Sequence, residues 1–354
     1  MTGDQPHRET LDPVPWTMRS EPSMAYHRFL LRVGGQLPDE YIVMARQWLA
    51  EHWVLGVART LAFAAHTENL AITRSEARLL TDTLSSAGES TRLVDALPRA
   101  TRDQRLPYLL VGSAELRGWN ETGRGHVQQA AVAGAESTEG VAGLWRAWRV
   151  GLLAGHEVAP KRIFLLQARP DVDAVRLVSR LQESLIEAGE KHPLVEVFDQ
   201  PVLLPRFSRR ALVTGDLLWA DRPVPALSVA STFDAVGPDG TPVFSGQRPR
   251  LVEPEQELVA HYLARGLQVV PDAGAVVDPL APGLGAVVPT ALRSDGRWIW
   301  SEAATYYLKN YGFAPDDGLL DTIRLRNYER PELDAVAEHQ CRLAANSKIY
   351  GAAH

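Results

Sequence analysis

Three polar residues near the middle of the chain could perform acid–base or binding chemistry. Glu121, Arg124 and His126 fall within residues 118–126, a segment that also holds a tryptophan, an asparagine and three glycines. Binding and catalytic residues are concentrated on loops that a rigid scaffold positions, so this segment is a candidate functional loop. An ordinary surface turn explains the same composition equally well.

Two further acids lie beside the end of an apolar run. Glu196 and Asp199 flank Phe198. Ligands of an open α/β sheet collect outside the carboxyl ends of its strands, so the two carboxylates could form a pair at such a site. The alternative is that Glu196 points to solvent from a half-buried strand while Asp199 starts a turn.

Aromatic and arginine side chains form the strongest feature of the sequence. Residues 144–149 read Leu-Trp-Arg-Ala-Trp-Arg, and residues 298–313 hold six aromatic side chains. Trp, Tyr and Arg dominate the energetics of interfaces, because each buries a large surface and keeps a polar group. The alternative is that these side chains pack the C-terminal helices against the sheet. The candidate binding residues are Trp145, Arg146, Trp148, Arg149, Trp298, Trp300, Tyr306 and Tyr307.

Motifs for cofactors, metals and activated nucleophiles are absent from the sequence. The chain has no GxGxxG between a strand and a helix, no GxxxxGK[ST], no HExxH, no CxxC and no GxSxG. The turn at 168–171 lacks glycine, and Asp171 would repel a phosphate there. We therefore predict no cofactor and no metal. A catalytic site assembled from distant residues stays open, because a triad needs no local motif.

Composition limits the class of protein. The chain has 354 residues, of which 45 % are hydrophobic and 23 % charged, with a net charge of −6. The densest basic stretch, residues 206–210, holds three arginines, too few for the basic stripe of a nucleic-acid-binding protein. No apolar run reaches the roughly 20 residues that a membrane helix needs. The N-terminus lacks the apolar core of a signal peptide, so we expect a cytoplasmic protein without nucleic-acid or membrane partners.

Hydrophobic periodicity predicts an α+β fold with four parts. Residues 1–22 read as a flexible arm, 23–97 as a helical bundle, 98–270 as a central α/β sheet region, and 271–354 as a loop plus a C-terminal helical module. The clearest unit has strands at 163–166 and 194–198 joined by a helix over 171–188. This βαβ unit predicts two parallel strands within a mixed sheet.

Other predicted elements rest on local signals. Residues 212–219 read as a third strand, 229–236 and 241–244 as a hairpin, and 271–289 as a surface loop. Thr73 and Glu76 form a capping box at the start of a helix. Ser301 is predicted to cap a helix that ends at Gly312.

Several segments resemble a group of uncharacterised actinobacterial proteins. The resemblance is carried by Leu-Pro-Asp-Glu at 37–40, by residues 143–149, and by residues 294–300, 306–308 and 312–315. It implies a bacterial, cytoplasmic setting and supplies no activity or catalytic residue.

These features predict a non-catalytic, protein-binding protein with an adaptor, neutralising or assembly role. The lack of a catalytic motif, the acidic balance and the aromatic–arginine clusters motivate this hypothesis. The alternative is an enzyme whose site lies near residues 118–126 and the ends of the central strands. A homo-oligomer, in which the partner is a second copy of the chain, is the third hypothesis.

Overall fold

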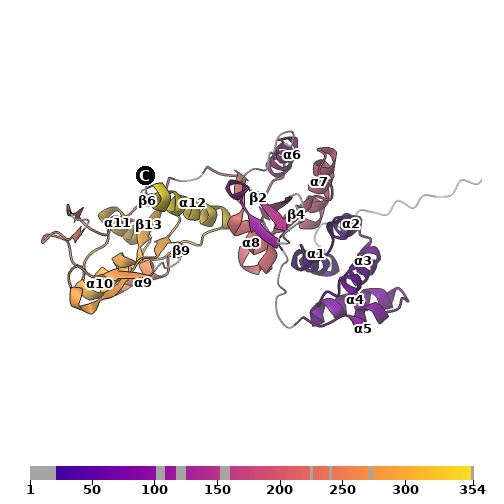
Figure 1. Ribbon diagram of the computed structural model, residues 1–354, viewed down its shortest axis with the longest axis horizontal. Coiled ribbons are helices and arrows are strands. Elements are labelled where there is room, and N and C mark those ends of the chain that lie inside the picture. Colours follow the sequence, from indigo (N-terminus) through magenta and orange to yellow (C-terminus); the bar gives the residue numbers. More distant parts are fainter. Residues whose placement is uncertain are drawn as a thin grey trace, which may run out of the picture. The chain divides into compact units, whose positions relative to one another are not determined.

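The computed structural model describes residues 21–100, 108–116, 125–151, 160–223, 226–238, 241–270 and 274–351. Helices and mixed sheets share these ranges, which confirms the predicted α+β class (Figure 1). The chain forms two compact units, Met1–Asp216 and Leu217–His354. The predicted arm, 1–22, lies almost wholly outside the described residues. The boundary between the units falls inside the predicted 98–270 region.

Five helices form the N-terminal bundle of the first unit. The inward face of its first helix repeats apolar residues at helical spacing, with Tyr26, Phe29, Leu30 and Val33 all buried. Val175 belongs to the same apolar core, so the bundle and the sheet region share one unit. The helices are α1 (Glu21–Val33), α2 (Asp39–Ala50), α3 (Val54–Thr67), α4 (Arg74–Ser86) and α5 (Arg92–Ala96).

The predicted capping box is present at the start of α4. The backbone N–H of Glu76 donates to the Thr73 hydroxyl at 3.2 Å, and the Thr73 N–H donates to the Glu76 carboxylate at 2.8 Å. We expect Thr73→Ala to lower the free energy of unfolding by about 1 kcal/mol, because an N-cap bond is lost. Urea denaturation measures this. Thr67→Ala is the control, since that hydroxyl donates to the Phe63 carbonyl within its own helix; equal losses would contradict the capping role.

Four strands form the main path of the sheet in the first unit. The strands are β1 (Tyr108–Val111), β2 (Val141–Gly151), β3 (Lys161–Ala168) and β4 (Leu194–Phe198), in the order β1-β2-β3-β4. β3 and β4 are parallel, while β1–β2 and β2–β3 are antiparallel. Helix α7 (Ala174–Glu187) joins β3 to β4, so the predicted βαβ unit is confirmed.

Helices cover both faces of this sheet. α6 (Gly125–Glu136) packs on β2 and on α7, and α8 (Arg206–Thr214) packs on β1, β2 and β3 from the other side (Figure 1). The predicted strand 212–219 is wrong in its first half. Leu212 continues the buried face of α8, which holds Phe207 and Ala211, and β5 (Asp216–Ala220) begins only after Gly215.

The second unit is built on a four-stranded sheet. Its order is β6-β13-β12-β9, from β6 (Ser228–Val229), β9 (Leu267–Val270), β12 (Leu292–Ser294) and β13 (Trp298–Ser301). Ser301 caps α10 (Glu302–Tyr311), which ends at Gly312 in the left-handed conformation, as predicted. The other helices are α9 (Glu255–Ala264), α11 (Asp317–Leu325) and α12 (Ala335–Gly351).

Two predictions in this unit need correction. The predicted hairpin has only two-residue strands, β7 (Ala235–Val236) and β8 (Pro242–Val243), and part of its turn lies outside the described residues. The predicted loop 271–289 contains a second hairpin, β10 (Ala275–Val277) with β11 (Ala286–Pro289). The prolines and glycines that suggested a loop concentrate between these strands, where η3 (Pro282–Leu284) lies. None of the described helices is both long and apolar enough to cross a membrane.

Candidate functional site

The aromatic residues expected at a binding surface lie mostly inside the protein. Trp145 and Trp300 are 0 % and 1 % exposed, and Trp148 and Tyr307 are buried as well. Trp298 and Tyr306 are partly buried. β2 is buried along residues 143–148 because helices cover both of its faces. These side chains therefore belong to the cores of their units and offer no broad exposed patch.

Arg146 and Arg149, which each follow one of the tryptophans of β2, make internal contacts. Arg146 donates to Gln128 of α6 at 2.5 Å and to the Ser113 hydroxyl at 2.6 Å. Arg149 forms a bidentate ion pair with Asp39 of α2, at 2.9 and 2.6 Å. The guanidinium of Arg146 also lies 5.4 Å from the centre of the Trp148 ring. The aromatic–arginine segment thus ties β2 to its covering elements.

Three of the five candidate catalytic residues lie in the described part of the chain, and they differ in element and in exposure. Glu121 and Arg124 lie outside the described residues, and His126 is exposed in the first turn of α6. Asp199 is exposed just after β4, whereas Glu196 is fully buried. The expectation that Glu196 points to solvent is wrong, because its carboxylate faces the bundle.

Glu196 belongs to a buried polar cluster, the edge clasp, made of His27, Arg46 and Glu196. Arg46 Nη2 lies 2.6 Å from Glu196 Oε2, and the two side chains are 2 % and 1 % exposed. A second Arg46 nitrogen donates to the Val195 carbonyl, and His27 Nε2 donates to the Val197 carbonyl at 2.9 Å. β4 ends the described sheet order, so the clasp closes the outer edge of the sheet with side chains from α1 and α2.

Burial shifts the pKa values of two side chains in the edge clasp, those of His27 and Glu196. It lowers the pKa of His27 to about 4, helped by the neighbouring charge of Arg46. It raises the pKa of Glu196, which Arg46 opposes. At neutral pH, His27 is therefore uncharged and its ring is held by the Val197 carbonyl.

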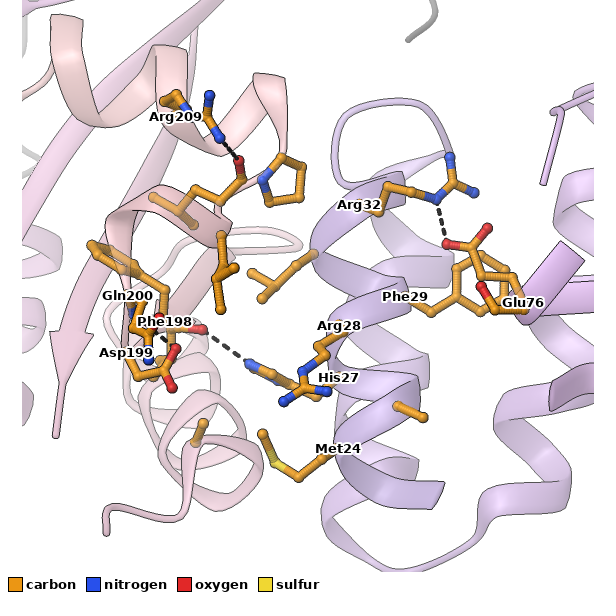
Figure 2. Close-up of a pocket in the computed structure, with 18 of the residues that line it drawn as sticks. Met24, His27, Arg28, Phe29, Arg32, Glu76, Phe198, Asp199, Gln200 and Arg209 are labelled. Atoms are coloured by element: carbon orange, nitrogen blue, oxygen red, sulfur yellow. Dashed lines mark hydrogen bonds and ion pairs between the residues drawn. The ribbon is translucent and has the colours of Figure 1, made fainter. Parts of the chain in front are cut away.

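A large pocket, the groove, opens beside the edge clasp within the first unit. Its volume is about 1530 Å³. One wall comes from α1 and α4; the other comes from the end of β4, η2 (Pro201–Leu203) and α8 (Figure 2). The turn after β3 and the residues after β4 also line it, so the groove lies at the carboxyl ends of two parallel strands. This is where ligands of an α/β sheet are expected, and Asp199 lines it.

The lining of the groove combines apolar and cationic side chains. The apolar group includes Met24, Leu31, Phe198, Leu203 and Val213. Among the described residues, seven arginines line the groove against three carboxylates, those of Glu76, Asp82 and Asp199. The groove is therefore positively charged. The arginines are Arg28, Arg32, Arg78, Arg169, Arg206, Arg209 and Arg210.

Four of these arginines have partners within the protein. Arg32 pairs with Glu76, Arg78 lies 3.6 Å from Asp82, and Arg169 lies 3.2 Å from Asp171. Arg209 donates to the Val202 and Leu204 carbonyls, both at 2.9 Å.

The other three arginines form no ion pair with any side chain that the structure describes. Within the described ranges, no carboxylate lies within 4.0 Å of the guanidinium of Arg28, Arg206 or Arg210. These groups are the ones placed to bind an external anion.

Metal and thiol chemistry find no support in the described part of the chain. It contains no group of three or more His, Cys, Asp or Glu side chains that could hold a metal ion. Cys341 is buried in α12, where burial raises the pKa of its thiol. The Ser294 hydroxyl donates to Cys341 Sγ at 3.2 Å, which gives the thiol a structural contact.

One wall of the groove has a signal in the sequence, the spacing of three arginines, that a count of basic residues does not reveal. Three arginines at 206, 209 and 210 share one helical face once this stretch is taken as a helix. The opposite wall comes from α1 and α4, which lie far earlier in the sequence, and no local pattern links the two walls. A comparison of the chain with models of known protein families, with curated proteins and with solved structures finds no match.

Proposed function

We propose that this protein acts by non-catalytic binding of another protein in a bacterial cytoplasm, and that the groove receives a segment of the partner. The observation that carries this proposal is the size and lining of the groove. Its volume of about 1530 Å³ exceeds the roughly 300–1,000 Å³ of pockets built for small ligands. A cavity of this size accommodates several residues of a polypeptide.

Exposed apolar side chains in the groove support a macromolecular partner. Leu203 is 65 % exposed and Val213 is 54 % exposed, and the adjacent Val202 is also largely exposed. Arg206 and Arg209 lie next to them on α8. An apolar patch bordered by polar side chains is typical of a protein-binding site. This surface replaces the buried tryptophans as the proposed contact surface.

A second candidate function is catalysis in the same groove. The observation in its favour is that His27 and Asp199 both line a pocket at the carboxyl ends of β3 and β4. An uncharged histidine can act as a base. A metabolite that stabilises the wild-type protein thermally, and fails to do so with Asp199→Asn, would favour this function over protein binding.

Affinity capture with a groove variant tests the proposed function. Leu203→Ser with Val213→Ser removes two exposed apolar contacts and should leave the fold intact. Leu93→Ser with Ile186→Ser is the matched control, since these side chains are 40 % and 44 % exposed and do not line the groove. We expect a stoichiometric partner with the wild type and the control, and loss of most of that partner with the groove variant. Equal capture by all three proteins would contradict binding in the groove.

A further inference from the structure

One wall of the groove is a cationic helical face. Arg206, Arg209, Arg210 and Val213 occur on α8 at the spacing i, i+3, i+4 and i+7, and all four are exposed. The opposite face of α8 is buried against the sheet and consists of Phe207, Ser208, Ala211 and Leu212. The exposed face therefore presents three arginine side chains, followed by the apolar side chain of Val213 near the end of the helix.

The facing wall repeats this combination. Met24, Arg28 and Leu31 lie on α1 at the spacing i, i+4 and i+7, and all line the groove. In Figure 2, Met24 and Arg28 project from α1 on the side that faces Phe198 and Asp199. Both helical walls thus offer an arginine and an apolar contact within about two turns.

The edge clasp excludes one common mode of peptide binding. An extended peptide that joins a sheet must bond to the free carbonyl and N–H groups of its edge strand. On β4, the Val195 and Val197 carbonyls already accept hydrogen bonds from Arg46 and His27. A partner in the groove therefore has to satisfy its own backbone, which a helix does.

We propose that the partner segment is an acidic amphipathic helix, an inference that rests on the proposed function. Its carboxylates would pair with Arg28, Arg206 and Arg210, which have no carboxylate partner among the described residues, because arginine binds carboxylates in a bidentate way. Its apolar side chains would cover Leu203 and Val213. The charge of the groove and the helical spacing of both walls specify this chemistry together.

Peptide binding to the full-length protein tests the inference. The probe is a fluorescein-labelled peptide of about 18 residues, long enough to form a helix, with Glu and Leu at helical spacing. One control peptide has Lys in place of Glu, and another alternates Glu and Leu as a strand does. We expect fluorescence anisotropy to give the helical acidic peptide a dissociation constant at least about tenfold lower than either control peptide, and weaker binding as salt is raised.

Charge-reversal variants make the test specific to the groove. We expect Arg206→Glu with Arg210→Glu to weaken binding of the acidic helical peptide by at least about tenfold. Arg92→Glu with Arg180→Glu should leave binding unchanged, because these exposed arginines lie outside the groove. Thermal denaturation of each variant checks that it is folded.

Three results would overturn the inference. They are no measurable binding of the helical acidic peptide, equal binding of a control peptide, or no effect of the charge reversal at Arg206 and Arg210. A captured partner that depends on Leu203 and Val213 but not on these arginines would leave the proposed function standing and the acidic helix wrong. A captured partner whose binding depends on neither the apolar pair nor the arginine pair would contradict both the proposed function and the acidic helix.

Discussion

Arg46→Leu is expected to lower the free energy of unfolding by about 3–5 kcal/mol. The reason is that the substitution leaves the Glu196 carboxylate buried without its ion-pair partner. Glu196 is fully buried, and its ion pair with Arg46 at 2.6 Å compensates its charge. The substitution also leaves the Val195 carbonyl without the Arg46 hydrogen bond at the sheet edge. Chemical denaturation at pH 7 measures the effect.

A second substitution separates the cost of the unpaired charge from the value of the pair. Arg46→Leu combined with Glu196→Leu should recover most of the lost stability, because apolar residues of similar volume can replace a buried ion pair. Arg59→Leu is the control, since it breaks an exposed ion pair with Glu89 in the same bundle and should cause no comparable loss. A double variant as unstable as Arg46→Leu would show that the edge clasp has another role.

Acid is expected to destabilise the protein through His27. The pKa of His27 is about 4 in the folded protein and 6.5 when the side chain is unperturbed. Between these values the unfolded chain binds a proton that the folded protein does not, so stability falls as the pH falls. The loss amounts to about 1.4 kcal/mol per pH unit and reaches about 3 kcal/mol near pH 4. The dependence weakens through pH 6.5 and is nearly absent about one pH unit above it.

A glutamine substitution isolates this contribution. His27→Gln keeps a donor for the Val197 carbonyl and removes the titrating ring. Between pH 6.5 and pH 4, we expect the free energy of unfolding to fall more steeply with falling pH for the wild type than for the variant. The difference between the two slopes should correspond to about one bound proton. His66→Gln, at an exposed histidine, should behave as the wild type does. Glu196 is present in all three proteins, so its opposite dependence on pH cancels. Parallel curves for wild type and His27→Gln would contradict the assignment.

Local signals in the sequence were sufficient for much of the fold. The bounds of β4, the parallel pairing of β3 with β4, the Thr73 capping box and the Ser301 cap were all predicted. Each depends on residues close in sequence or on the chirality of a βαβ unit. The strand at 212–219 failed because Leu212 fits both an apolar strand and the buried face of a short helix.

The placement of single side chains depended on long-range packing. Trp148 is buried because α6 and α8 cover the two faces of β2. The alternation of residues within a strand does not show whether helices cover one face or both. Glu196 interrupts an apolar run and so suggested a solvent-facing position. Its partner, Arg46, is 150 residues away. The groove was not predicted from the sequence for the same reason. Its walls on α1 and α8 are far apart in the sequence and come together only in the folded chain.

Photo-crosslinking from the groove tests the central proposal most directly. A photoreactive phenylalanine analogue at Val213 would lie inside the groove, and the same residue at Ile186 on α7 would lie outside it. Irradiation in cells followed by mass spectrometry identifies what each position touches. The proposal predicts one dominant protein, crosslinked from Val213 and absent from Ile186, with the crosslink in an acidic and apolar segment of that protein. No protein crosslink from Val213, or the same set of proteins from both positions, would contradict it.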